Sequence, residues 1–297
     1  MATVLNREAA YAVAEAVAVR LGAETAGLKL LGPIADNAVF RLPGGVVARI
    51  SSPASYERAA HEVRIGGWLA AHGVPAVRPL EVADLPWSVA GQVVTLWHEV
   101  PDASMASTAE LAELLRRLHA LPVPSDFGLP TLDPFVRVEE HLAAAAGALE
   151  VTDRQFLVDQ LDVLRPAYAD AAAGLPVCVI HGDANRKNAI RGREGIAVLL
   201  DLERSSLGPR EWDLVVPAVY QRLGWYSDPE YDAFVDAYGW DIRAWDGFAV
   251  FAAIREFRMT AWLVSRLARE PRLAAEAGRR IASLRNPDSP RAWTPGV

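Results

Sequence analysis

Residues 177–188, VCVIHGDANRKN, and residues 198–201, VLLD, hold the densest group of polar residues on an apolar background. Each stretch contains an apolar run that predicts a buried strand, and the polar side chains lie at or just beyond the strand ends, where they can converge on a cleft. Asp183, Asn188 and Asp201 supply two carboxylates and an amide oxygen. Such oxygen donors suit Mg²⁺, which also binds substrate phosphates. The pattern therefore indicates phosphoryl transfer.

The spacing agrees with the kinase template, in which one aspartate accepts the proton of the acceptor hydroxyl. An asparagine five residues later and a further aspartate then hold the metal ion. A polar loop between two core strands is the alternative, and it would explain a single aspartate or asparagine. It does not explain His, Gly, Asp and Asn at fixed spacing, followed by a second apolar strand that ends in aspartate.

The composition narrows the class of protein. The chain has 297 residues, 52% of them apolar, which is enough for a large core and about two domains. Its 30 Lys plus Arg and 37 Asp plus Glu give a net charge of -7, which disfavours nucleic acid and anionic membranes as partners. The single cysteine, Cys178, excludes an intrachain disulfide and a cysteine-rich metal site. Without a secretion signal or a long uncharged apolar run, we expect a cytoplasmic protein with a small-molecule partner.

Two lobes are predicted, residues 1–100 and residues 101–297. The first begins with a helix and continues as a small antiparallel sheet with one helix inserted after its third strand, whereas the second is mainly helical. Strands are expected at 28–32, 38–42, 46–50, 77–82 and 92–100, and helices at 6–21, 55–73, 108–120, 135–149, 153–173, 212–222, 229–238, 245–268 and 272–284.

The sequence resembles the aminoglycoside phosphotransferase and choline kinase superfamily, whose signature is a His-Gly-Asp-x-x-x-x-Asn loop followed by an apolar strand that ends in aspartate. HGDANRKN (181–188) and VLLD (198–201) match that signature. The resemblance continues in GPREWDL (208–214) and, more weakly, in GPIADNAVFRL (32–42) and HEVRIGGWLAAHGVP (61–75). It implies an α+β, bilobal protein-kinase-like fold with ATP, or GTP, between the lobes.

The resemblance also implies roles for residues. Asp183 is the expected catalytic base, and Asn188 and Asp201 are the expected Mg²⁺ ligands. His181 is expected to orient the catalytic loop, and Asp213 to anchor that loop from the following helix. For Asp213, a helix N-terminal charge that complements the macrodipole is the alternative.

Arg49 replaces the lysine that kinases place on the third strand to hold the ATP phosphates. The only two lysines, Lys29 and Lys187, do not occupy that place. Glu62 lies thirteen residues after Arg49 on the predicted helix, so the two are the candidate ion pair. An arginine fork can bind phosphate oxygens through two nitrogens. A surface arginine on an edge strand is the alternative.

The nucleotide loop also departs from kinase patterns, because the chain has neither a Walker motif nor a glycine-rich Gly-x-Gly-x-x-Gly loop. Backbone amides around Asp36 and Asn37 are expected to cover the phosphates, with an ordinary hairpin turn as the alternative. From the resemblance, backbone groups of His98 and Val100 are expected to meet the adenine.

Residues 211–250 contain eight acidic and two basic residues, which would favour an amine-bearing acceptor if they lined its pocket. A solvated helical surface is the alternative. Candidate acceptor contacts, some of which can equally be core or surface residues, are Lys187, Glu203, Trp225, Tyr226 and Asp228.

The sequence thus predicts an ATP- and Mg²⁺-dependent kinase that phosphorylates a hydroxyl of a small molecule, with an aminoglycoside-like or other hydroxylated antibiotic as the expected acceptor. One alternative is a metabolite kinase for choline, an amino alcohol or a sugar. Another is a non-catalytic nucleotide-binding protein of the same fold, which the intact set of predicted catalytic and metal-binding residues disfavours.

Overall fold

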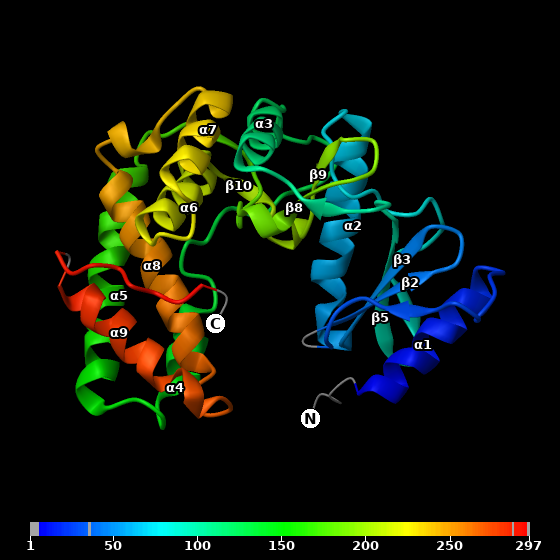
Figure 1. The fold of residues 1–297 in the computed structure, drawn as a ribbon, viewed down its shortest axis with the longest axis horizontal. Coiled ribbons are helices and arrows are strands. Elements are labelled where there is room, and N and C mark those ends of the chain that lie inside the picture. Colours follow the sequence, from blue (N-terminus) through cyan, green and yellow to red (C-terminus); the bar gives the residue numbers. More distant parts are fainter. Residues whose placement is uncertain (1–5, 35–36, 287, 296–297) are drawn as a thin grey trace. The chain divides into compact units, whose positions relative to one another are not determined.

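The structure is a computed structural model that describes residues 6–34, 37–286 and 288–295 (Figure 1). The chain divides into two compact units. The first is Met1–Ala106 with Arg186–Ser205, and the second is Ser107–Asn185 with Ser206–Val297. Residues 186–205, which begin with the last three residues of the HGDANRKN motif, are therefore part of the first unit. None of the helices in the described ranges is long and apolar enough to cross a membrane.

The first unit is built on an antiparallel sheet with the strand order β1-β2-β3-β5-β4. The turn between β2 and β3 contains Gly44 and Gly45, both at positive φ (84° and 75°), which a tight hairpin readily uses. The strands are β1 (Lys29–Leu30), β2 (Asn37–Leu42), β3 (Val46–Ser51), β4 (Trp87–Val89) and β5 (Gln92–His98).

The two faces of this sheet contact different helices. Along β3, Ala48 and Ile50 pack in an apolar cluster with α1 (Arg7–Arg20). Because side chains alternate across a strand, Arg49 lies on the other face, where it meets α2 (Tyr56–Ala71), the helix inserted after the third strand as predicted. The alternation thus puts the arginine on the face of the sheet that α2 contacts.

The strand expected at 77–82 is wrong. That segment makes an isolated bridge at Pro79, opposite Trp97, and is otherwise irregular. A proline has no N–H to donate to a strand ladder. This segment still makes backbone hydrogen bonds to the end of β5, while β4, which the sequence analysis missed, pairs with the beginning of β5.

A second sheet in the first unit has the order β6-β8-β9. Its strands are β6 (Ser104–Met105), β8 (Ala189–Arg191) and β9 (Ala197–Leu199). The hairpin of β8 and β9 pairs Ala189 with Leu199. This pairing brings together the residues just before β8 and just after β9.

The second unit is mainly helical, with a two-stranded antiparallel ladder of β7 (Val177–Ile180) and β10 (Ser206–Pro209). Its core joins Leu157, Trp212, Phe251 and Phe257 from three of the helices. The predicted helix 135–149 is shorter than expected, since the residue before it, Arg137, has left-handed backbone geometry (φ 62°). The helices are α3 (Thr108–His119), α4 (Val138–Ala145), α5 (Val151–Ala172), α6 (Glu211–Arg222), α7 (Asp228–Tyr238), α8 (Phe248–Ser265) and α9 (Ala274–Arg285).

Candidate active site

The loop that carries Asp183 begins directly after β7 in the second unit. Asp213, in the first turn of α6, is fully buried, and its carboxylate accepts from the backbone N–H groups of His181 (2.7 Å) and Gly182 (2.8 Å). The Trp212 indole N–H donates to the Gly182 carbonyl at 3.2 Å. The sequence analysis expected Asp213 to anchor this loop, and the hydrogen bonds confirm that position.

His119, the last residue of α3, completes the anchor. Its Nε2 lies 3.0 Å from Asp213 Oδ2, and its Nδ1 lies 2.9 Å from the Tyr238 hydroxyl. A single histidine on a predicted helix carries no spacing signal, so the sequence alone could not reveal this contact.

The two motif residues of the loop have different surroundings. His181 is fully buried, and its Nδ1 accepts from the backbone N–H of Asp183 at 3.3 Å, which agrees with an orienting role. The Asp183 side chain is 28% exposed and forms an ion pair with Arg255 of α8 at 3.0 Å. The Asp183 carboxylate is therefore both partly accessible to solvent and paired with a cation.

Asn188 and Asp201 lie at the same end of the β8–β9 hairpin in the first unit. The N–H of Leu200 donates to the Asn188 carbonyl at 2.8 Å, which ties the two segments together. Asp201 has left-handed backbone geometry (φ 55°), uncommon for a residue with a Cβ, and its side chain is 43% exposed. An amide oxygen and an accessible carboxylate fit Mg²⁺, which retains several water ligands. Within the described ranges, no three His, Cys, Asp or Glu side chains form a group that could hold a metal ion.

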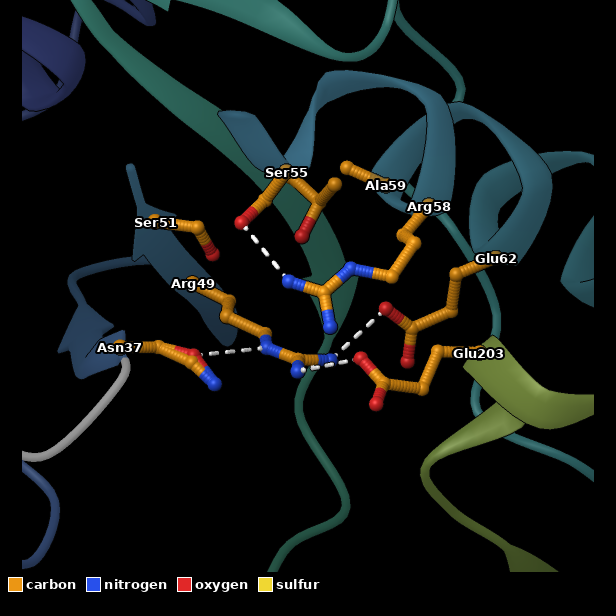
Figure 2. Close-up of a pocket in the computed structure, with 9 residues that line it drawn as sticks. Asn37, Arg49, Ser51, Ser55, Arg58, Ala59, Glu62 and Glu203 are labelled. Carbon is orange, nitrogen blue, oxygen red and sulfur yellow. Dashed lines mark hydrogen bonds and ion pairs between the residues drawn. The ribbon is translucent and has the colours of Figure 1, made fainter. Parts of the chain in front are cut away.

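Arg49 is the centre of a polar pocket in the first unit (Figure 2). Its Nη1 donates to Glu62 at 2.8 Å, so the predicted ion pair is present. Its Nη2 donates to Glu203 at 3.2 Å, and its Nε donates to the Asn37 side chain at 3.2 Å. Asp201 lies 4.0 Å from Nη1. Arg49 is therefore held by four polar side chains and is not a loose surface residue.

Burial and charge shift the pKa values in this pocket. Burial is the largest influence on Glu62 and raises its pKa to about 7, although the nearby Arg49 charge acts in the opposite direction. Burial tends to lower the pKa of Arg49, but the charges of Glu62, Asp201 and Glu203 outweigh it and raise that pKa. Arg49 thus keeps its positive charge at every physiological pH.

The first unit also contains a cavity of about 640 Å³ beside Arg49. Its walls include apolar side chains, among them Val47, Trp97 and Leu200, which suit the faces of an aromatic base. Predicted site residues that line it are Asn37, Arg49, Glu62, His98, Val100 and Asp201.

The backbone near this cavity distinguishes two of these residues. The N–H of His98 donates to the Arg78 carbonyl, and that of Glu99 donates to the Gly45 carbonyl. Within the described part of the chain, the Val100 backbone makes no hydrogen bond, so it is the better candidate for a base contact. Asp36, expected to cover the phosphates, lies outside the described residues.

The candidate acceptor contacts differ in burial and in their partners. Trp225 is partly buried and donates its indole N–H to the Trp293 carbonyl, while Tyr226 is buried. Asp228 accepts from Gln221 at 2.7 Å, and Lys187 is exposed. Glu203 accepts a hydrogen bond from Arg49. Most of the candidate acceptor contacts therefore already have partners within the protein.

Much of the acidic character of residues 211–250 also has structural causes. Asp213 anchors the loop, and Glu230 forms a capping box with Ser227 at the start of α7. Asp241 pairs with Arg243. The number of acidic residues in 211–250 therefore does not by itself show that they line an acidic pocket.

Comparisons with known proteins agree with this geometry. By sequence, no curated protein matches the chain. Among solved structures, a choline/ethanolamine kinase family protein from Mesorhizobium loti is 22% identical, covers 94% of this chain and 96% of its own, and has a TM-score of 0.63. Aminoglycoside phosphotransferase APH(3'')-Id from Streptomyces rimosus is 21% identical, with coverages of 82% and 97% and a TM-score of 0.60. Amicoumacin kinase hAmiN, solved with AMP-PNP, Ca²⁺ and Ami, is 13% identical, with coverages of 98% and 98% and a TM-score of 0.70.

These likenesses show a shared protein-kinase-like fold, which confirms the predicted fold class. A model of the phosphotransferase enzyme family matches residues 27–251, a range that includes Arg49, the anchored loop with Asp183 and the β8–β9 hairpin. The chain therefore belongs to the phosphotransferase enzyme family.

Proposed function

We propose that this phosphotransferase transfers the γ-phosphoryl group of ATP to a hydroxyl of a small molecule. The observation that carries the proposal is the Asp183 loop, because Asp213 fixes its backbone while the Asp183 carboxylate remains partly exposed. A base that is fixed and accessible can orient an acceptor hydroxyl and take its proton.

The nucleotide is proposed to bind in the cavity beside Arg49. The apolar walls would accept the base, with Val100 offering backbone groups and with GTP as a possible second donor. Arg49 is held by Glu62 and Glu203, so its guanidinium is already placed to meet phosphate oxygens. Asn188 and Asp201 would hold Mg²⁺, which neutralises phosphate charge when bound.

For the acceptor we propose an aminoglycoside-like or other hydroxylated antibiotic. Support comes from the similarity to a phosphotransferase also solved with ADP and streptomycin and to the amicoumacin kinase. A metabolite kinase is the second candidate, favoured by the similarity to the choline/ethanolamine kinase family protein. A choline-type site would need accessible aromatic faces, whereas Tyr226 is buried and Trp225 is partly buried.

The test is a screen for ADP release with MgATP and MgGTP across aminoglycosides, other hydroxylated antibiotics, nucleosides, choline, ethanolamine and hexosamines. Asp183→Ala is the control. We expect one acceptor class to stimulate the wild type, and Asp183→Ala to lower turnover at least ~100-fold while nucleotide binding is retained. Equal turnover by the variant would refute the assignment of the base, and a chain that binds no nucleotide would refute the kinase proposal.

A further inference from the structure

Arg255 of α8 is far from Asp183 in the sequence and belongs to none of the motifs that predicted the site. Its Nη2 nevertheless lies 3.0 Å from Asp183 Oδ1. We propose that Arg255 is a positioning residue for phosphoryl transfer, which holds the Asp183 carboxylate in one orientation for the acceptor hydroxyl. This inference rests on the proposed kinase function.

The burial of Arg255 shows that the contact is more than a surface ion pair. Its side chain is 11% exposed, and its Nε is buried without a hydrogen-bond partner in the described structure. A buried guanidinium is costly unless an anion lies close to it. Burial lowers the pKa of Arg255, but Tyr220 and Asp183 outweigh it and raise that pKa above the usual range. The cation is thus stabilised by the predicted base itself.

The other carboxylate on this part of α8 is already engaged. Glu256, next to Arg255 in sequence, is 1% exposed and pairs with Arg222 (2.5 Å) and Arg291 (3.3 Å). Among the described carboxylates, Asp183 is therefore the one ion-pair partner that the structure gives Arg255.

Tyr220 also contacts the guanidinium, through the nitrogen that pairs with Asp183. Arg255 Nη2 also donates to the Tyr220 hydroxyl at 3.1 Å. The Tyr220 ring packs edge-on against Trp225 (4.9 Å between centroids) and Tyr226 (5.4 Å). Trp225 and Tyr226, candidate acceptor contacts by sequence, thus acquire a different role: they fix the tyrosine that fixes Arg255.

A positioned base requires this kind of restraint. The Asp213 anchor holds the backbone on the N-terminal side of Asp183, but it does not set the side-chain torsions of Asp183. A charge-assisted hydrogen bond from a rigid, buried arginine does set them. Since displacement of a reacting group by about 1 Å can cost ~100-fold in rate, the loss of Arg255 should be visible in kcat.

The first arm of the test measures the pairing without any acceptor. Urea unfolding midpoints are compared for the wild type, Asp183→Asn, Arg255→Met and the double variant. We expect each single change to lower the midpoint and the double variant to lie well above the additive value, because it leaves no unpaired charge. Arg266→Met, which removes a more exposed pair with Glu270, is the matched control.

The second arm measures positioning. For Arg255→Ala we expect kcat to fall ~100-fold with KM for MgATP within about twofold, and methylguanidinium below its denaturing range to restore part of kcat. Arg255→Lys should recover more activity than Arg255→Ala, and Arg266→Met should match the wild type. A merely structural role for Arg255 would give no rescue by methylguanidinium.

The two arms separate the two ideas. Additive midpoints, or an Arg255→Ala enzyme with wild-type kcat, would overturn the inference. A wild type that transfers no phosphoryl group, together with non-additive midpoints, would refute the proposed function and leave the ion pair established.

Discussion

Replacement of Asp213 by Asn tests how the loop that carries Asp183 is held. Asp213 Oδ2 accepts from the N–H of His181 and meets His119 Nε2, while Oδ1 accepts from the N–H of Gly182. Asparagine keeps one of these acceptors and turns the other into an N–H₂ donor. One or two hydrogen bonds to a charged group are lost, each contributing about 1.5–3 kcal/mol. The free energy of unfolding should therefore fall by roughly 2–6 kcal/mol, a large fraction of the total for a folded domain.

Urea unfolding at pH 7 provides the measurement, with Asp236→Asn as the matched control. Asp236 is an exposed aspartate on α7, so its amide variant should behave like the wild type. With an m-value of about 2–3 kcal/mol/M, the Asp213→Asn midpoint should fall by roughly 0.7–3 M. The affinity for nucleotide should be unchanged, since the cavity lies in the first unit. An Asp213→Asn midpoint equal to that of the control would refute the anchoring argument.

Three further changes address other parts of the two units. Arg49→Lys keeps the charge but cannot bridge two carboxylates as a planar fork does, so KM for MgATP should rise about tenfold in steady-state kinetics. The folded-state pKa of Glu62 is raised from 4.5 to about 7, so its contribution to the free energy of unfolding is fully present below pH 4.5. About 3 kcal/mol of that contribution is lost by pH 7. Glu62→Gln should therefore remove this dependence on pH from urea midpoints measured from pH 5 to 8. In Gly208→Ala, the new Cβ would lie 2.9 Å from Ile180 Cδ1 and 3.0 Å from Leu132 Cβ. Thermal unfolding should therefore show that the variant is less stable by about 1–3 kcal/mol. An unchanged thermal midpoint would contradict this packing.

The sequence predicts those parts of the site whose residues lie close together along the chain or in one hairpin. A strand that ends at Ile180 must be followed at once by His181 and Asp183, and the β8–β9 hairpin must bring Asn188 near Asp201. The spacing of the motif residues reflects both of these local arrangements. The pairing of Arg49 with Glu62 was also predictable, because the kinase template pairs a basic residue of the third strand with a glutamate of the following helix.

The missed residues come from helices that meet the loop only through tertiary packing. His119 ends α3 and Arg255 lies in the middle of α8, and neither stands at a fixed distance from a motif. The same limit explains the wrong strand at 77–82, since apolar alternation did not reveal that β4 pairs with β5 at the sheet edge. Periodicity predicts an element and its buried side, whereas partners are chosen by the packing of the whole unit.

Charge is the property for which counting residues misleads most. The acidic residues of 211–250 suggested a cationic acceptor, yet Asp213, Glu230 and Asp241 are engaged in loop anchoring, helix capping and an ion pair. Asp183 itself pairs with the arginine Arg255, and a carboxylate and a guanidinium together carry no net charge. Electrostatic steering toward amines therefore has no source in this pair. The acceptor screen should accordingly include neutral and anionic hydroxylated compounds alongside the amines, and a response to amines alone would show that other carboxylates form the acceptor pocket.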